Sequence, residues 1–162
     1  MSEEKTITIT VNEKSVELVV PAHRTLLEAL RHEGFVEIKC GCEKGDCGAC
    51  AVLLDGEPAD SCLTLAWHAD GCEVTTIKGI GQPGNADTLQ KTFIETGASQ
   101  CGYCTPGMIV AAKSLLEKNP NPSLDDIKRG LSGNLCRCTG YTRIFEAVQL
   151  AAEELRAEGE SA

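Results

Sequence analysis

Hydrophobic and polar side chains alternate near the start of the chain, which is the pattern of a half-buried β-strand. Ile7, Ile9 and Val11 fall on one face of Thr6–Val11, and Ser15–Val20 repeats the alternation after a short polar turn. Successive side chains of a strand point to opposite faces, so each run has one hydrophobic face. Two such runs joined by a short turn predict a β-hairpin.

The alternation then gives way to a helical pattern with clear ends. Thr25 and Glu28 have the spacing of a capping box, in which each side chain bonds a backbone N–H of the other residue, and Gly34 is a stop signal. Further strands are predicted at Ala51–Leu54 and Glu73–Ile77. The N-terminal half is therefore expected to be β-rich with one helix.

The second half of the chain has no strand pattern. Thr105 and Pro106 supply an N-cap and a proline at the first helical position. Helices are predicted over Thr88–Thr96, Thr105–Lys118, a short segment from Ser123, and Thr142–Leu155. The sequence thus predicts an α+β fold with a β-rich domain at 1–78, a Gly- and Pro-rich linker at 79–87, and an all-α domain at 88–162.

Composition excludes several classes of function. The 162 residues carry a net charge of −9 and only 4% aromatic side chains, which argues against binding of nucleic acid. No run approaches the roughly 20 apolar residues of a membrane helix. The acidic first residues do not resemble a signal peptide, so a cytoplasmic location is expected.

Ten cysteines change this picture of an ordinary globular protein. In a reducing compartment, and in a chain long enough to build a core, such a number favours metal or cofactor binding over a disulfide scaffold. Eight of the ten fall into two sets, one in each predicted domain.

The first set has the spacing of a plant-type [2Fe–2S] ferredoxin. Cys42, Cys47 and Cys50 form a C-x₄-C-x₂-C pattern, and Cys62 is the candidate fourth ligand. Glycines between the cysteines allow the loop to turn tightly and to point its amides at the cluster. A zinc site is the main alternative, although it prefers two C-x₂-C pairs. A thioredoxin-like motif at Cys47 and Cys50 is a weaker interpretation, because the helix that this motif requires is not predicted there.

The second set lies before two predicted helices. Cys101 and Cys104 precede the helix at 105–118, and Cys136 and Cys138 precede the last helix. Helix N-termini stabilise an anion, which favours a four-thiolate cluster at this place. A disulfide oxidoreductase that uses Cys101 and Cys104 is a competing interpretation, although no βαβ pattern flanks them.

Three further features receive no chemical role. Cys40 and Cys72 are expected to be free thiols, because a ligand at Cys40 would replace the x₄ gap with x₆. The run Gly79-x-Gly81-x-x-Gly84 matches a dinucleotide fingerprint, but no second strand follows it, so it is interpreted as part of the linker.

With these motifs the chain resembles the small iron–sulfur subunit of molybdenum hydroxylases. This is the family of xanthine dehydrogenase, aldehyde oxidoreductase and carbon monoxide dehydrogenase. The matching segments are Gly41–Cys50, Asp55-Gly56 through Leu63, Gln100–Met108 and Asn134–Tyr141, and the resemblance extends over about residues 4–155.

The resemblance implies a β-grasp plant-type ferredoxin domain followed by a four-helix bundle, each with one [2Fe–2S] cluster. The implied ligands are Cys42, Cys47, Cys50 and Cys62 for the first cluster, and Cys101, Cys104, Cys136 and Cys138 for the second. It also implies that Gln100 and Cys138 contact the molybdopterin of a large subunit.

The same resemblance implies an electron-transfer role in an oxidoreductase complex. Electrons would pass between molybdopterin on the large subunit and FAD on a medium subunit, or another acceptor, in a heterotrimer or a dimer of heterotrimers. The chain itself would perform no substrate chemistry. The expected substrate is an N-heteroaromatic such as a purine or nicotinate. Carbon monoxide dehydrogenase, aldehyde dehydrogenase and 4-hydroxybenzoyl-CoA reductase stay open as alternatives, and so does a stand-alone ferredoxin-type carrier.

Overall fold

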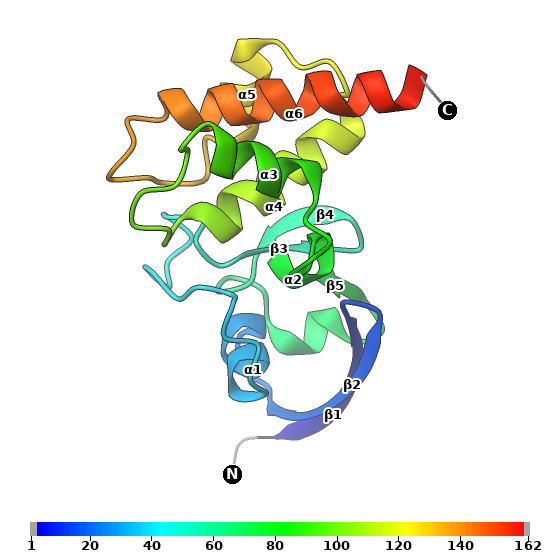
Figure 1. The fold of residues 1–162 in the computed structure, drawn as a ribbon. Helices are drawn as coiled ribbons and strands as arrows, with labels where there is room; N and C mark the ends of the chain where they lie inside the picture. The colour runs from blue at the N-terminus through cyan, green and yellow to red at the C-terminus, as the bar shows by residue number, and fades with distance from the viewer. Residues whose placement is uncertain (1–2, 161–162) are drawn as a thin grey trace.

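The N-terminal half folds as a mixed sheet in the computed structural model, which describes residues 3–160 (Figure 1). The strands are β1 (Glu4–Val11), β2 (Lys14–Pro21), β3 (Ala51–Leu54), β4 (Glu57–Asp60) and β5 (Glu73–Thr75). Their order across the sheet is β2-β1-β5-β3-β4. β1 runs parallel to β5, and the other neighbours are antiparallel.

The predicted hairpin is confirmed. β1 pairs with β2 in a register that places Ile7 opposite Leu18 and Val11 opposite Lys14. The turn between them consists of Asn12 and Glu13, whose φ angles are 48° and 67°. Positive φ at both central residues gives a turn whose twist matches that of the strands.

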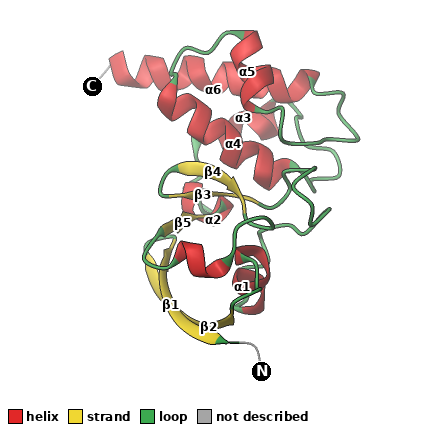
Figure 2. Ribbon diagram, turned by 180° about the vertical axis from the view of Figure 1, so that it is seen from behind, coloured by secondary structure: helices red, strands yellow, loops and turns green. Residues whose placement is uncertain are grey.

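One α-helix covers the sheet and closes the first core together with a short 3-10 helix, η1 (Ala66–Ala69). The α-helix, α1 (Leu26–His32), begins with the predicted capping box of Thr25 and Glu28. Leu26 and Leu30 are fully buried. Their neighbours in the core include Ile7, Ile9, Val52 and Val74 from the strands. Both ribbon views show α1 on one side of the curved sheet (Figures 1 and 2).

Two predictions in this half were incomplete. β4 was missed, because it is a short edge strand that contains Pro58, a residue that lowers strand propensity. The strand predicted to reach Ile77 ends at Thr75, and α2 (Ile77–Ile80) follows inside the segment expected to be a strand end and linker. Thr76 ends the strand because its N–H donates to Asn12 Oδ1 at 2.8 Å and its hydroxyl caps α2.

The second half is helical and has its own core. It contains α3 (Thr88–Glu95), α4 (Thr105–Lys118), α5 (Leu124–Gly130) and α6 (Thr142–Glu160). Core residues include Leu89, Phe93, Met108, Ile127, Ile144 and Val148. The N-cap of α4 is Cys104 and not Thr105 as predicted, and α6 extends beyond the predicted end at Leu155.

The two halves meet through α4, which packs on β3 and β4. Gly107 of α4 lies so close to the first cysteine loop that a Cβ atom there would stand 2.3 Å from the carbonyl oxygen of Gly48. The buried Asn134 Nδ2 donates to the same oxygen at 2.9 Å. The cysteine-bearing loops of both halves therefore gather on one side of the molecule (Figure 2). Among the described helices none has the length and apolar character needed to cross a membrane.

Candidate metal centres

The first cysteine loop stabilises the ionised form of one of its thiols. The backbone N–H groups of Lys44 and Asp46 donate to Cys42 Sγ at 3.4 and 3.3 Å. The N–H of Lys44 is the largest influence on the thiol, and together with the other donors it lowers the pKa of Cys42 to about 7. The loop thus favours a thiolate at this position before any ligand is considered.

The four predicted cysteines of the first site lie in two pairs. The side chain of Cys42 interacts with that of Cys47, and the side chain of Cys50 with that of Cys62. Cys50 and Cys62 are buried at the edge of the first core. Burial is the largest influence on Cys50 and raises its pKa to about 12. The site therefore has one outer and one buried pair of thiols.

Glycine is required where the loop passes closest to its own sulfur atoms. A Cβ atom on Gly41 would lie 2.8 Å from Cys47 Sγ. Gly45 has a φ of +79°, and a Cβ there would collide with the Leu63 side chain. These positions need the small residue for the close approach and the left-handed backbone that the sequence pattern predicted.

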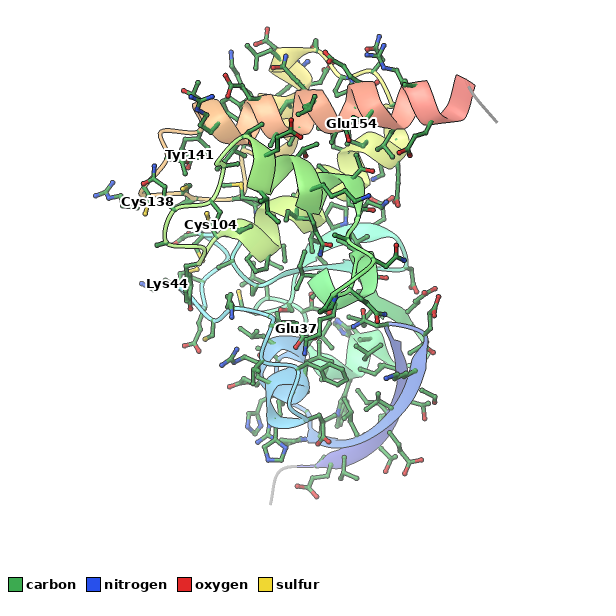
Figure 3. The ribbon with its side chains drawn as sticks, viewed as in Figure 1. Glu37, Lys44, Cys104, Cys138, Tyr141 and Glu154 are labelled. Atoms are coloured by element: carbon green, nitrogen blue, oxygen red, sulfur yellow. The ribbon has the colours of Figure 1, made fainter. Side chains whose placement is uncertain are left out.

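The second site is built at the beginnings of α4 and α6. Cys101 and Cys104 lie before and at the start of α4, and Cys136 and Cys138 lie in the loop that leads into α6. Cys104 and Cys138 project into the same region in Figure 3. The thiols again form two pairs, since the side chain of Cys104 interacts with that of Cys136, and that of Cys101 with that of Cys138. Burial raises the pKa of Cys104 to about 12.

A side-chain hydroxyl donates to one thiol of the second site. Thr139 Oγ1 lies 3.1 Å from Cys136 Sγ and donates to it. Burial acts to raise the pKa of Cys136, but the hydrogen bonds from Thr139 and from nearby backbone amides outweigh it and lower that pKa. Sequence reasoning assigned no role to Thr139, because the local motif does not reveal where its hydroxyl points.

The paired arrangement fits a two-iron cluster at each site. In a [2Fe–2S] cluster with four cysteine ligands, each iron takes two thiolates. Each site presents two thiol pairs, one for each iron. Within residues 3–160, no three His, Cys, Asp or Glu side chains gather closely enough to hold a single metal ion. All ten cysteines lie in the part of the chain that the structure describes, and each is a free thiol.

The two sites adjoin each other. The N–H of Leu135, next to Cys136, donates to the carbonyl oxygen of Cys47 at 2.9 Å. Tyr103, which lies between Cys101 and Cys104 in the sequence, donates its phenol hydrogen to the carbonyl oxygen of Cys40 at 2.6 Å. Figure 3 shows the labelled residues of both loops along the same side of the molecule.

Comparison with known proteins agrees with this arrangement. A 2Fe-2S iron-sulfur cluster binding domain matches residues 9–77, and a [2Fe-2S] binding domain matches residues 76–149. The small FeS subunit of nicotinate dehydrogenase from Eubacterium barkeri is 46% identical over 149 residues, which are 91% of this chain and 95% of that subunit. The chain belongs to the iron–sulfur subunits of the molybdenum hydroxylase family.

Other relatives of this iron–sulfur subunit are named for different activities. The xanthine dehydrogenase iron-sulfur-binding subunit of Escherichia coli O157:H7 is 44% identical, with 91% of this chain and 96% of that one covered. Among solved structures, quinoline 2-oxidoreductase from Pseudomonas putida 86 matches with a TM-score of 0.90 and 43% identity over 96% of this chain and 98% of that chain. The predicted fold of a ferredoxin-like domain followed by a helical domain is confirmed.

Gln100 and the two cysteines that were given no ligand role, Cys40 and Cys72, lie outside the thiol pairs. Gln100 is exposed and directly precedes Cys101. Cys40 donates to Glu43 Oε1 at 2.9 Å, a hydrogen bond that raises its pKa. Cys72 lies near the His68 carbonyl oxygen, at 3.7 Å, in the sheet domain. In this iron–sulfur subunit, Cys40 and Cys72 therefore have polar partners other than the paired cysteines.

Proposed function

We propose that this subunit transfers electrons between the molybdopterin centre of a large partner subunit and FAD on a medium subunit, or another acceptor. Two [2Fe–2S] clusters would each take up and release one electron. The single observation that carries the proposal is the presence of two thiol pairs at each of two adjoining sites. The proposed ligands are Cys42, Cys47, Cys50 and Cys62 for the first cluster, and Cys101, Cys104, Cys136 and Cys138 for the second.

The chain itself holds the cluster ligands in position and sets their electrostatic surroundings. Buried thiols and short loops hold the ligands, and the Leu135 to Cys47 hydrogen bond keeps the two loops at a fixed separation. We also propose that domain boundaries fall at 1–78, 79–87 and 88–162. Separate hydrophobic cores in the two halves support this division.

We further infer that the surface near Gln100 and Cys138 faces the molybdopterin of the large subunit. Both residues are exposed at the second site. We also propose that the complex is a heterotrimer, or a dimer of heterotrimers, and that it is located in the cytoplasm. The ten free thiols support the location, because disulfides are rare in the cytoplasm.

The proposed substrate of the complex is an N-heteroaromatic compound such as a purine or nicotinate. Relatives named for nicotinate, xanthine, nicotine and quinoline support this choice. The alternative is an aldehyde, because aldehyde oxidoreductase from Megalodesulfovibrio gigas is 46% identical over 89% of this chain, which is 16% of that longer protein. Substrate selection resides in the large subunit.

The proposal is tested on the complex purified through a tag on this chain. We expect about four irons per chain, and two distinct S = 1/2 EPR signals after reduction with dithionite. Copurification of molybdenum and flavin subunits is expected as well, and the complex should oxidise a purine or nicotinate in preference to an aldehyde. About two irons per chain, or disulfides among the eight cysteines, would contradict the cluster assignment. A lone chain that carries both clusters would instead indicate a stand-alone electron carrier.

A further inference from the structure

The Thr139 hydroxyl at the second site is oriented by its own hydrogen bonds. Its oxygen accepts from the N–H of Tyr141 at 3.1 Å, and the hydroxyl donates to Cys136 Sγ at 3.1 Å. A backbone N–H can only donate, so Tyr141 occupies an acceptor position of the hydroxyl oxygen. The single hydroxyl hydrogen is thereby left to point at the sulfur.

Tyr141 is itself held in an unusual conformation. Its φ of +69° lies in the left-handed region, which a bulky residue rarely adopts unless its surroundings fix it. The surroundings here are specific, since the Tyr141 phenol oxygen accepts from the N–H of Cys136 at 2.9 Å. The ring also stacks on Phe145, with centroids 5.9 Å apart. The strained backbone is what presents the Tyr141 N–H to Thr139.

We propose that Thr139 sets the reduction potential of the second cluster through its hydrogen bond to Cys136, and that Tyr141 is the positioning residue that aims this hydroxyl. The proposal rests on the assignment of Cys136 as a cluster ligand. The step concerned adds one electron, supplied by the partner subunit's molybdenum centre, and it transfers no proton and breaks no bond.

The direction of the effect follows from the charge. Reduction increases the negative charge shared by the thiolate sulfurs, and a hydrogen bond to a more negative acceptor is stronger. The Thr139 hydroxyl therefore stabilises the reduced state more than the oxidised state, which raises the potential. At the first site the corresponding donors to Cys42 are backbone N–H groups, which a side-chain substitution does not remove.

The test is a redox titration of the purified complex followed by EPR. Thr139→Val keeps the shape of the side chain and removes the hydroxyl. We expect the second-cluster signal to titrate at a more negative potential, with the ratio of reduced to oxidised cluster lower by about tenfold at a fixed potential, which corresponds to about 59 mV. The first-cluster signal should not move. Thr139→Ser should restore the wild-type potential, and Tyr141→Phe should shift it in the same direction as Thr139→Val but by less.

A matched control is available at the same site. Thr105 directly follows Cys104, but its hydroxyl donates to Ser99 Oγ at 3.1 Å and not to a thiol. Thr105→Val should therefore leave both potentials unchanged. An equal shift in Thr105→Val and Thr139→Val, or no shift in Thr139→Val with about four irons retained, would overturn the proposal.

Two further outcomes separate this proposal from the cluster assignment. Thr139→Ala provides a second removal of the hydroxyl. If Thr139→Val and Thr139→Ala both lose two irons while Thr139→Ser keeps them, the hydroxyl holds the cluster in place and the tuning role is overturned. A wild-type complex that lacks the second EPR signal contradicts the cluster assignment itself, whatever the variants do.

Discussion

The two cysteine sites stabilise thiolate charge with different parts of the protein. At the first site the donors to Cys42 are the backbone N–H groups of Lys44 and Asp46. At the second site a side-chain hydroxyl, that of Thr139, donates to Cys136, and two helices begin beside the thiols. The first site therefore depends on how the main chain turns, whereas the second adds a side-chain donor to the backbone amides near Cys136.

In each site, nevertheless, one pair of thiols is more exposed than the other. The first has an outer pair, Cys42 and Cys47, and a buried pair that includes Cys50. The second has an exposed pair, Cys101 and Cys138, and a more covered pair that includes Cys104. Burial raises the pKa of both Cys50 and Cys104 to about 12, so the covered pair of each site contains a thiol whose ionised form is strongly disfavoured.

The largest expected effect comes from removing a covered ligand. Cys104→Ser should remove the second cluster, halve the iron content to about two per chain, and abolish one EPR signal. Cys50→Ser should abolish the other signal. Cys72→Ser is the control and should keep about four irons, because Cys72 lies outside both sites. Loss of both signals in Cys104→Ser would show that the sites do not assemble independently.

The next largest effect is expected when a methyl group is added at Gly48, where the two halves touch. Gly48 has a φ of +66°, and a Cβ there would lie 2.4 Å from the Gly133 carbonyl oxygen and 2.6 Å from Asn134 Nδ2. We expect Gly48→Ala to lower the free energy of unfolding by about 2–5 kcal/mol, from left-handed strain and overpacking together. Denaturant unfolding followed by circular dichroism measures the change.

Gly133→Ala is the matched control for this substitution. A Cβ on Gly133 would meet no atom within 4 Å. The control should therefore change stability by less than about 1 kcal/mol. If Gly48→Ala also had so small an effect, the tight contact between the halves would not contribute to stability, and the first site would be less dependent on its backbone than we infer.

Local features of the fold were predictable because their causes are local. The hairpin followed from alternation in Thr6–Val11, and α1 from the capping box of Thr25 and Glu28. The cysteine spacing around Cys42 indicated a ferredoxin-like loop because three ligands from one short loop leave a fixed pattern. Each of these signals lies within a few residues of the structure that it specifies.

Features that depend on distant contacts were not predictable in this way. The short α2 begins where Thr76 bonds Asn12, a residue 64 positions away. The sequence predicted that the four cysteines of the second set come together, but which of them pair depends on two loops that are far apart in sequence. The hydroxyl of Thr139 is aimed by the positive φ of Tyr141. A single sequence does not report such a backbone angle at a tyrosine, because other residues dictate it.

A smaller effect is expected at the polar contact between the halves. Asn134→Ala removes a buried side-chain hydrogen bond to the Gly48 carbonyl oxygen, which then accepts only from the N–H of Ala51 at 3.2 Å. The expected loss is about 1–2 kcal/mol of unfolding free energy, from the lost hydrogen bond and the buried space that the side chain fills. Asn134→Asp should cost at least as much, since a carboxylate oxygen cannot donate to a carbonyl. The exposed Asn121→Ala serves as the control, and an equal loss there would contradict the assigned role of Asn134.

The smallest effects test whether the two halves unfold together. Thr25→Ala removes the N-cap of α1 in the sheet domain, and Ser123→Ala removes the N-cap of α5 in the helical domain. Each should cost about 1 kcal/mol. Because α4 packs on β3 and the cysteine loops are hydrogen-bonded to each other, we expect both variants to lower the midpoint of one shared transition in calorimetry. Two transitions, with Thr25→Ala shifting only one and Ser123→Ala only the other, would mean that the contact through Gly48 and Gly107 is too weak to couple the domains, and that the clusters are held at a fixed separation only within the assembled complex.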